Sequence, residues 1–460
     1  MKINKICCIG AGYVGGPTMA VIAQKNPHIQ ITLVDLNQEK INLWNSKDYN
    51  ELPVYEPGLA DVIKEVRGRN LFFSTDINKN IDEADMIFIS VNTPTKTEGE
   101  GKGYAADLKY IESCAKQIAK VAKSDKIIVE KSTVPVRTSE RIKQILKINN
   151  NDVEFQILSN PEFLAEGTAM RDLQIPDRVI IGGDNSPKGN IAVNSLVNIY
   201  LAWVPKKNIL TTNLWSSELS KLTANAFLAQ RISSINSLSE LCESTGADIE
   251  EVSKAIGMDS RIGSSFLKTS VGFGGSCFQK DILNLVYIAR SLKLDKVADY
   301  WEQILIINRH QRDRFSKKII LAIEQKQLQN NVLILGWAFK KNTNDSRESA
   351  AIYVADNLLN NKINIGVYDP KVENVQIQTD LKSINNKYAE NINFKKPPFD
   401  ELINYNIIAV MTEWDEFINY DWKDIYNKMS KPAYIFDGRN ILNDRLLKEI
   451  GFRYYAIGRK

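Results

Sequence analysis

The sequence predicts an α/β protein with two Rossmann-like, doubly wound parallel-sheet domains joined by a central helical domain. Short apolar strands alternate with helical patterns over residues 5–181 and again over residues 331–436, as expected for sheets built from βαβ units. Between these regions the strand signals stop and long helical patterns take their place. We therefore expect three domains, at residues 1–212, 213–328 and 329–460.

The bulk composition excludes several classes of protein. The chain has 460 residues and a net charge of +4, with 59 Lys and Arg against 55 Asp and Glu, so no broad basic field points to nucleic acid. No apolar run approaches the roughly 18 residues of a membrane helix, and no signal peptide opens the chain, so neither a membrane partner nor export is expected. The odd number of cysteines, five, favours a reducing, cytoplasmic setting over a disulfide framework.

A glycine-rich turn follows the first predicted strand, Lys5 to Ile9. It reads Gly10-Ala-Gly-Tyr-Val-Gly15, and Asp35 ends the second strand. In this context the glycines let the backbone approach a pyrophosphate, the helix N-terminus stabilises its charge, and the acid binds the adenosine ribose. Because Asp35 would repel a 2′-phosphate, the expected cofactor is NAD rather than NADP.

Polar residues follow the later strands of the first domain, which we expect at residues 70–74, 86–91, 126–130, 154–158 and 178–181. Thr93 and Ser132 lie in such loops, and open parallel sheets bind ligands at the carboxyl ends of their strands. We therefore expect both residues to border the cofactor. A later turn offers two carboxylates, Glu162 and Glu166, which either transfer protons or mark the start of a helix.

The central domain is expected to contain two long helices, from Leu214 to Ser244 and from Asp295 to Glu324. Glu218, Lys221 and Asn225 share one face of the first helix. A solvated face is the commoner explanation for such a row. Asn225, however, stands among residue types that are usually buried, and a buried amide needs hydrogen-bond partners, which favours a site.

One cysteine lies in a glycine-rich turn before a further helix. The turn reads Gly272-Phe-Gly-Gly-Ser-Cys277, and apolar spacing predicts a helix from Asp281 to Arg290. Glycine tolerates the close approach of a ligand, and the N–H groups of a helix N-terminus favour a thiolate. Cys277 is therefore a candidate nucleophile, with Asp281 about one turn later. The alternative is a buried structural cysteine beside a tight turn.

The third domain begins with a strand and a glycine, but lacks the fingerprint of the first. Strands are expected at residues 331–335, 363–368, 407–411 and 433–436. The loops at their ends carry cations that together suit a second anionic ligand. These cations are Lys340, Lys341, Arg347 and Arg439, and for any one of them taken alone an ordinary surface charge is the better explanation.

Together these motifs resemble the UDP-glucose 6-dehydrogenases of the UDP-glucose/GDP-mannose dehydrogenase family, and are most similar to the animal type. The resemblance runs from Ile6 to about Asn440. It implies a NAD-dependent four-electron oxidation of UDP-glucose to UDP-glucuronate through a thiohemiacetal and a thioester on Cys277. The alternatives are a dehydrogenase of another nucleotide sugar, UDP-N-acetylmannosamine or GDP-mannose, and a NAD-binding module without catalysis.

The resemblance also implies roles for individual catalytic residues. Lys221 stabilises the developing oxyanion or handles the alcohol proton, and Asn225 donates a hydrogen bond to the same oxygen. Glu162 is the expected base and Asp281 the residue that orients the attacking water, with Thr133 assisting. No metal site is expected.

The same resemblance implies two sets of binding residues and an oligomer. Arg261 resembles an arginine that reaches the neighbouring subunit's site, which implies a homodimer or a higher homo-oligomer. The implied UDP-glucose contacts are Phe163, Leu164, Glu166, Arg261, Lys268, Phe273, Gly274, Phe339, Lys340 and Arg439. The implied NAD contacts are Gly10, Gly12, Tyr13, Val14, Gly15, Asp35, Lys40, Thr93, Ser132, Glu166, Lys280 and Arg347.

Overall fold

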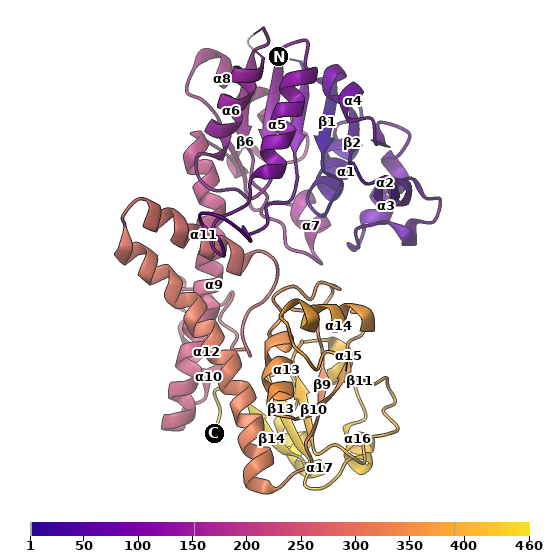
Figure 1. The fold of residues 1–460 in the computed structure, drawn as a ribbon, viewed down its shortest axis with the longest axis vertical. Coiled ribbons are helices and arrows are strands. Elements are labelled where there is room, and N and C mark those ends of the chain that lie inside the picture. Colours follow the sequence, from indigo (N-terminus) through magenta and orange to yellow (C-terminus); the bar gives the residue numbers. More distant parts are fainter. Residues whose placement is uncertain (1, 151, 391) are drawn as a thin grey trace. The chain divides into compact units, whose positions relative to one another are not determined.

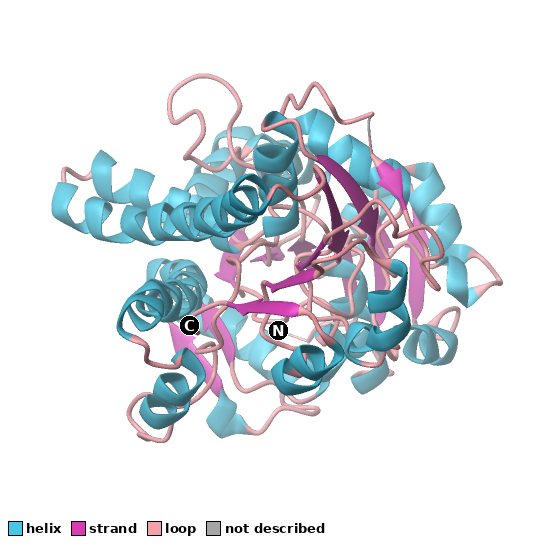
Figure 2. Cartoon of the chain, turned by 90° about the horizontal axis from the view of Figure 1, so that it is seen from below, coloured by secondary structure: helices cyan, strands magenta, loops and turns pink. Residues whose placement is uncertain are grey.

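The computed structural model describes residues 2–150, 152–390 and 392–460. The chain divides into two compact units, residues 1–224 and residues 225–460. Each unit contains one sheet flanked by helices (Figure 1, Figure 2). The predicted fold class is therefore confirmed, and the finer division into three domains stays a prediction.

The first unit is built on an eight-stranded sheet of order β3-β2-β1-β4-β5-β6-β7-β8. From β3 to β6 all neighbouring strands are parallel, but β7 pairs antiparallel with β6 through Ser159 and Gly182. This pairing differs from the predicted parallel sheet, and the edge strand β8 was not predicted. Its strands are β1 (Lys5–Ile9), β2 (Gln30–Val34), β3 (Leu71–Ser74), β4 (Met86–Ile89), β5 (Lys126–Glu130), β6 (Phe155–Ser159), β7 (Val179–Gly182) and β8 (Ile209–Thr212).

Helices cover both faces of this sheet, and the alternation of strand side chains explains why. The neighbouring residues Cys7 and Cys8 of β1 belong to two different buried clusters, because successive strand side chains point to opposite faces. The helices of this unit are α1 (Gly15–Lys25), α2 (Gln38–Asn45), α3 (Leu59–Val66), α4 (Ile77–Glu83), α5 (Lys109–Val121), α6 (Thr138–Asn149), α7 (Ala169–Gln174) and α8 (Pro187–Tyr200), with short 3-10 turns at Tyr49–Glu51 and Lys206–Asn208.

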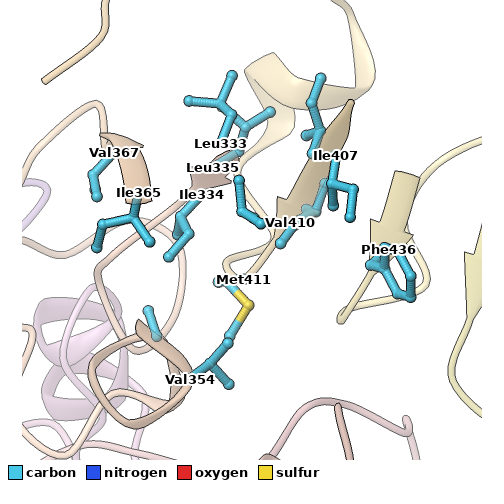
Figure 3. Packing of buried hydrophobic residues seen from close by; sticks show 14 of the residues in the cluster. Leu333, Ile334, Leu335, Val354, Ile365, Val367, Ile407, Val410, Met411 and Phe436 are labelled. Atoms are coloured by element: carbon cyan, nitrogen blue, oxygen red, sulfur yellow. The ribbon is translucent and has the colours of Figure 1, made fainter. Parts of the chain in front are cut away.

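The second unit contains a six-stranded, wholly parallel sheet of order β11-β10-β9-β12-β13-β14. Its core is apolar on both faces. Val354 of α13 (Ala350–Asn360) lies beside Met411, which follows β12 (Figure 3). The strands are β9 (Asn331–Leu335), β10 (Asn364–Tyr368), β11 (Asn393–Phe394), β12 (Ile407–Val410), β13 (Tyr434–Asp437) and β14 (Arg453–Ala456).

Two long helices dominate the middle of the chain, as predicted. α9 (Leu214–Thr245) starts at the end of the first unit, and α12 (Asp295–Lys326) packs against α11 (Phe278–Ser291) and α13 (Ala350–Asn360). Among the described residues, none of the helices combines the length and the apolar composition that crossing a bilayer requires. The remaining helices are α10 (Ile249–Gly257), α14 (Asn374–Ser383), α15 (Asp415–Ile418), α16 (Trp422–Lys428) and α17 (Asp444–Ile450).

Candidate active site

The glycine turn after β1 is shaped by close backbone contacts. Gly10 has a φ of +107°, and a Cβ at this position would lie 2.2 Å from the carbonyl oxygen of Ser90. A Cβ at Gly15 would lie 2.1 Å from the carbonyl oxygen of Gly10, whereas a Cβ at Gly12 would meet no atom within 4 Å. The turn is therefore tightly packed on one side and open at Gly12, next to the N-terminus of α1.

Asp35 follows β2 and is tied to the same turn. Its carboxylate accepts hydrogen bonds from the backbone N of Ala11 at 3.1 Å and of Asn37 at 3.0 Å, and it pairs with Lys40 Nζ at 3.0 Å. Burial alone would raise the pKa of Asp35, but these hydrogen bonds and Lys40 outweigh burial and lower the pKa. Asp35 is therefore charged, as a residue that binds ribose hydroxyls and repels a 2′-phosphate must be.

Thr93 and Ser132 join the loops that follow β4 and β5. Thr93 Oγ1 donates to the carbonyl oxygen of Thr133 at 2.8 Å, and Ser132 Oγ donates to the carbonyl oxygen of Val91 at 2.8 Å. Both hydroxyl side chains are buried. Each thus has a structural role, and their contact with the cofactor stays a prediction.

Glu162 forms a buried ion pair with Lys131. Glu162 Oε2 lies 2.8 Å from Lys131 Nζ, and Oε1 accepts hydrogen bonds from the backbone N of Phe163 at 2.8 Å and of Leu164 at 3.2 Å. Burial would raise the pKa of Glu162, but Lys131, the Phe163 N–H group and Lys221 together lower it. A carboxylate with a lowered pKa is always ready to accept a proton but is a weak base.

The side chains after Glu162 meet two cations. The ring of Phe163 lies 4.1 Å from the guanidinium of Arg178 and 5.3 Å from Lys221 Nζ, both measured to the ring centroid. Such contacts let an aromatic ring hold cations in place. Of the other two predicted residues, Leu164 packs against the core of the first unit, and Glu166 is half-buried.

The polar row on α9 is buried rather than solvated. Glu218, Lys221 and Asn225 are 1%, 7% and 6% exposed. Glu218 accepts hydrogen bonds from the backbone N of Arg137 at 2.6 Å and of Ser139 at 2.7 Å, at the start of α6. Glu218 therefore satisfies N–H groups at a helix N-terminus, and the catalytic roles of Lys221 and Asn225 stay predictions.

Cys277 is the N-cap residue of α11 and is exposed. Among the described residues all five cysteines are free thiols, and the other four, Cys7, Cys8, Cys114 and Cys242, are buried. The interpretation of Cys277 as a buried structural cysteine is therefore wrong. Its Sγ lies 3.5 Å from the hydroxyl of Ser276.

Asp281 lies one turn after Cys277 and contacts α9. Its side chain is fully buried, and its Oδ2 accepts a hydrogen bond of 2.6 Å from Asn225 Nδ2. An amide has two N–H donors, so this bond leaves Asn225 one donor for another oxygen. The structure thus joins Asn225 to Asp281, and the catalytic roles of both residues stay predictions.

The cysteine turn is held on two sides. Asn308 of α12 binds the backbone of Phe273 through both ends of its amide. The backbone N of Gly275 donates to the carbonyl oxygen of Arg347 at 2.8 Å, and a Cβ at Gly274 would lie 2.5 Å from the carbonyl oxygen of Glu348. Glycine is required at position 274 because the loop after β9 leaves no space for a side chain.

A buried carboxylate organises the turn that carries Arg439. Asp437 accepts hydrogen bonds from the backbone N of Arg439 at 2.9 Å and of Leu442 at 2.8 Å, and from Tyr454 Oη at 2.9 Å. Burial raises the pKa of Asp437 despite these bonds. The Arg439 guanidinium pairs with Glu413, so an anionic ligand would compete with that carboxylate.

The other predicted binding residues of the second unit lie in loops or at a helix start. Lys340 Nζ lies 5.5 Å from the centroid of the Phe339 ring. The Arg347 guanidinium donates to both carboxylate oxygens of Asp345. Arg261 is held by Asp259 while its side chain is 87% exposed. Lys268 is exposed, and Lys280 lies in the first turn of α11.

Sequence reasoning missed three residues that support the site: Lys131, Asn308 and Asp437. Asn308 follows the run Ile304-Leu-Ile-Ile, so the signal that singled out Asn225, an amide among apolar residues, was present there too. Lys131 stands directly after a fully buried strand, which could have marked its charge as one that needs a partner. Asp437 is the last residue of β13, and this position at the carboxyl end of a strand resembles that of Asp35 after β2.

Comparison with known sequences identifies the class of protein. The chain matches three models of the UDP-glucose/GDP-mannose dehydrogenase family: the NAD binding domain over residues 4–204, the central domain over residues 215–310, and the UDP binding domain over residues 333–444. The protein belongs to the UDP-glucose/GDP-mannose dehydrogenase family, as its motifs predicted.

Individual relatives are similar over their full length. The chain is 58% identical to the UDP-glucose 6-dehydrogenase of Drosophila melanogaster, covering 99% of this chain and 96% of the relative. It is 55% identical to that of Gallus gallus, covering 100% and 94%. Among solved structures, a UDP-glucose dehydrogenase from Pyrobaculum islandicum has 27% identity and a TM-score of 0.83, covering 100% of this chain and 98% of that one.

The residues of the first unit fit the NAD that this family uses. The open side of the turn at Gly12 gives a pyrophosphate access to the backbone, and charged Asp35 suits ribose hydroxyls. Gly10, Gly12, Gly15 and Asp35 would hold the cofactor, which supplies the hydride acceptor when bound. Among the described residues, no group of His, Cys, Asp and Glu side chains could hold a metal ion.

Proposed function

We propose that this protein oxidises UDP-glucose to UDP-glucuronate, with two molecules of NAD⁺ reduced for each sugar. Support comes from full-length relatives named UDP-glucose 6-dehydrogenase at 58% and 55% identity. The observation that carries the chemistry is the exposed thiol of Cys277 at the start of α11, one turn before the buried pair of Asp281 and Asn225.

In the proposed reaction Cys277 holds the intermediate between the two oxidations. After the C6 alcohol has become an aldehyde, the Cys277 sulfur adds to it, and a C–S bond forms in a thiohemiacetal. The second hydride loss converts this adduct to a thioester. Water then adds to the thioester carbon, the C–S bond breaks, and the carboxylate leaves with the thiol regenerated. The covalent adduct prevents escape of the aldehyde.

Four side chains assist these steps in the proposal. Lys221 stabilises the oxyanion that develops at C6, and Asn225 donates its second N–H to the same oxygen. Asp281 orients the attacking water, and Glu162 accepts its proton. Because the pKa of Glu162 is lowered, we assign Glu162 the role of an oriented acceptor rather than of a strong base. Thr133 assists in placing the water.

We further propose a cytoplasmic homo-oligomer in which Arg261 reaches the neighbouring subunit's site. The support is the resemblance to the family and the 87% exposure of the Arg261 side chain. Mixing Arg261→Ala with Cys277→Ala subunits tests this proposal, since mixed oligomers would regain activity that neither variant has alone. No regain after verified subunit exchange would contradict it. The divisions at residues 212/213 and 328/329 and the remaining binding residues are part of the same proposal.

The deciding experiment is the amount of NADH formed per UDP-glucose consumed, with limiting sugar and excess NAD⁺. A ratio of about two is required by the thioester route. A ratio of about one would mean that the reaction stops at the aldehyde. No NADH with UDP-glucose, but reduction with UDP-N-acetylmannosamine or GDP-mannose, would move the substrate to another nucleotide sugar.

A further inference from the structure

The ion pair of Glu162 involves a lysine that the proposed mechanism does not use. Lys131 follows β5, its side chain is 3% exposed, and its Nζ lies 2.8 Å from Glu162 Oε2. The same Nζ donates to Asn160 Oδ1 at 3.2 Å and to Tyr200 Oη at 3.4 Å. Three oxygens, two from the turn after β6 and one from the end of α8, thus surround the ammonium group, as a buried charge requires.

Both oxygens of Glu162 are fixed by this arrangement. Oε2 is held by Lys131, and Oε1 by the backbone N–H groups of Phe163 and Leu164. The side chain still has 15% of its surface exposed. A carboxylate oxygen can accept more than one hydrogen bond. Each oxygen of Glu162 can therefore accept a further hydrogen bond while its present contacts hold the side chain in one orientation.

We propose that Lys131 is a positioning residue that keeps Glu162 an oriented carboxylate, ready to accept the proton of the water that hydrolyses the thioester. This inference rests on the proposed function, since the state of Glu162 affects turnover only if Glu162 takes part in it. Lys131 itself acts through Glu162 and needs no contact with the sugar.

The charges around Glu162 make Lys131 the dominant partner. Burial raises the pKa of Glu162, and Lys131 provides the largest opposing effect, followed by the N–H of Phe163 and the charge of Lys221. Burial also raises the pKa of Tyr200, so the phenol is neutral near pH 7. Without Lys131, burial would therefore raise the pKa of Glu162.

The groups around Lys131 show that Glu162 is also the main ionic partner of Lys131. Burial would lower the pKa of Lys131, but Glu162 and then Tyr200 outweigh burial and raise it. Burial also raises the pKa of two further groups near Lys131, that of Cys8 to about 12 and that of Glu130. Glu162 is thus the anion that balances Lys131.

The first test is the pH dependence of kcat in the Lys131→Met variant. With the counter-ion gone, Glu162 keeps its proton to a higher pH, so the acidic limb of the profile should move up by about one pH unit. At a fixed pH on that limb, activity should be roughly tenfold lower. Lys131→Arg retains the charge and should restore the limb to a lower pH.

Lys126→Met, at the first residue of β5, provides a matched control. Lys126 is also 3% exposed, but its Nζ donates to the carbonyl oxygen of Asp82 at 2.7 Å and to Ser124 Oγ at 3.0 Å. The control therefore removes a buried lysine of equal size without removing a counter-ion of Glu162. It should lower the melting temperature and leave the acidic limb in place.

The second test needs no substrate. Lys131→Met should be compared with Lys131→Met/Glu162→Gln by melting temperature from about pH 5 to about pH 8. In the single variant the pKa of Glu162 is raised, so stability falls as pH rises through that pKa. The double variant has no carboxylate to ionise. The melting temperature of the double variant should therefore exceed that of the single variant most at the higher pH. At the lower pH the two melting temperatures should be similar.

Two results would overturn the proposal: an acidic limb that stays at the wild-type pH in Lys131→Met, or parallel melting profiles for the single and double variants. Either would leave Lys131 with a packing role only. The two proposals fail separately. If the wild-type protein reduces no NAD⁺ with UDP-glucose, the function is wrong, whereas the melting profiles still decide whether Lys131 keeps Glu162 ionised.

Discussion

Asn308 pairs with the backbone of Phe273 as a neighbouring strand would. Its Oδ1 accepts from the Phe273 N at 2.9 Å, and its Nδ2 donates to the Phe273 O at 3.0 Å. The amide is 1% exposed, so neither bond competes with water. Since Phe273 belongs to the turn that carries Cys277, α12 fixes the backbone from which the thiol projects.

Asn308→Ala should therefore reduce stability and turnover together. Loss of both bonds leaves two buried backbone groups without these partners, at a cost of about 2 to 3 kcal/mol in the free energy of unfolding. We expect kcat to fall at least about tenfold, because a loosened turn misplaces the thiol. Urea unfolding and initial rates measure the two effects.

Asn357→Ala is the control for this prediction. Asn357 of α13 donates to Ser316 Oγ at 3.0 Å and contacts no residue of the cysteine turn in the part of the chain that the structure describes. It should lose some stability and keep its kcat. A normal kcat in Asn308→Ala would show that the Asn308 amide supports folding alone.

Replacement of the thiol separates binding from chemistry. Cys277→Ala should bind NAD⁺ and UDP-glucose but lose sustained turnover, whereas Cys277→Ser should stall after the first oxidation or form an ester that hydrolyses slowly. Cys114→Ala, which removes a buried thiol of α5, should keep full activity. Steady-state rates and mass spectrometry of the protein check both outcomes. A Cys277→Ala variant with wild-type rates would exclude covalent catalysis.

Glu130 gives a pH-dependent stability prediction. Its side chain is 1% exposed, and burial and the nearby Glu218 raise its pKa. The folded state therefore holds this proton at a pH where the unfolded chain, with a pKa of about 4.3, has lost it. Stability contributed by the protonated form is present at low pH and lost as pH rises through the folded pKa.

Glu130→Gln has no proton to lose and should escape this loss. It should match wild type near pH 4 and exceed it by about 1 kcal/mol or more near pH 8. Melting temperatures in matched buffers measure the difference. Glu39→Gln, at an exposed position of α2, should show no such trend. An equal difference at both pH values would mean that Glu130 does not titrate in this way.

Periodic segments were predictable because their own sequence determines them. The helix expected from Leu214 to Ser244 is α9, Leu214–Thr245, and the strand expected at residues 5–9 is β1. β11 was missed because only two residues pair, and β14 because its side chains are partly exposed. The antiparallel direction of β7 depends on its pairing with β6, which no local pattern encodes.

The sequence predicted which residues belong to the candidate site better than it predicted which residues they contact. Motifs identified Cys277, Asp281 and Asn225, and the structure joins the last two at 2.6 Å. The partner of Glu162 was not foreseen, because Lys131 follows β5 whereas Glu162 follows β6, and only the fold brings them together. Similarly, the row on α9 predicted a polar face, but only the folded chain shows that Glu218 binds the start of α6.

Asp35 and Lys40 together predict how cofactor preference can be changed. The Asp35 carboxylate repels a 2′-phosphate and also occupies the Lys40 ammonium group at 3.0 Å. Asp35→Asn removes the repulsion and frees the cation for the phosphate. We expect the ratio of kcat/KM for NADP⁺ to that for NAD⁺ to rise at least about tenfold, which corresponds to about 1.4 kcal/mol.

The double variant Asp35→Asn/Lys40→Ala separates the two contributions. If the freed Lys40 attracts the phosphate, the double variant should lose part of the gain with NADP⁺, because only the repulsion has been removed. Lys40→Ala alone keeps the Asp35 charge and should show no gain. Initial rates at varied NAD⁺ and NADP⁺ measure all three ratios. A double variant with the full gain would mean that Lys40 serves only to hold Asp35, and an unchanged ratio in Asp35→Asn would remove Asp35 from cofactor selection.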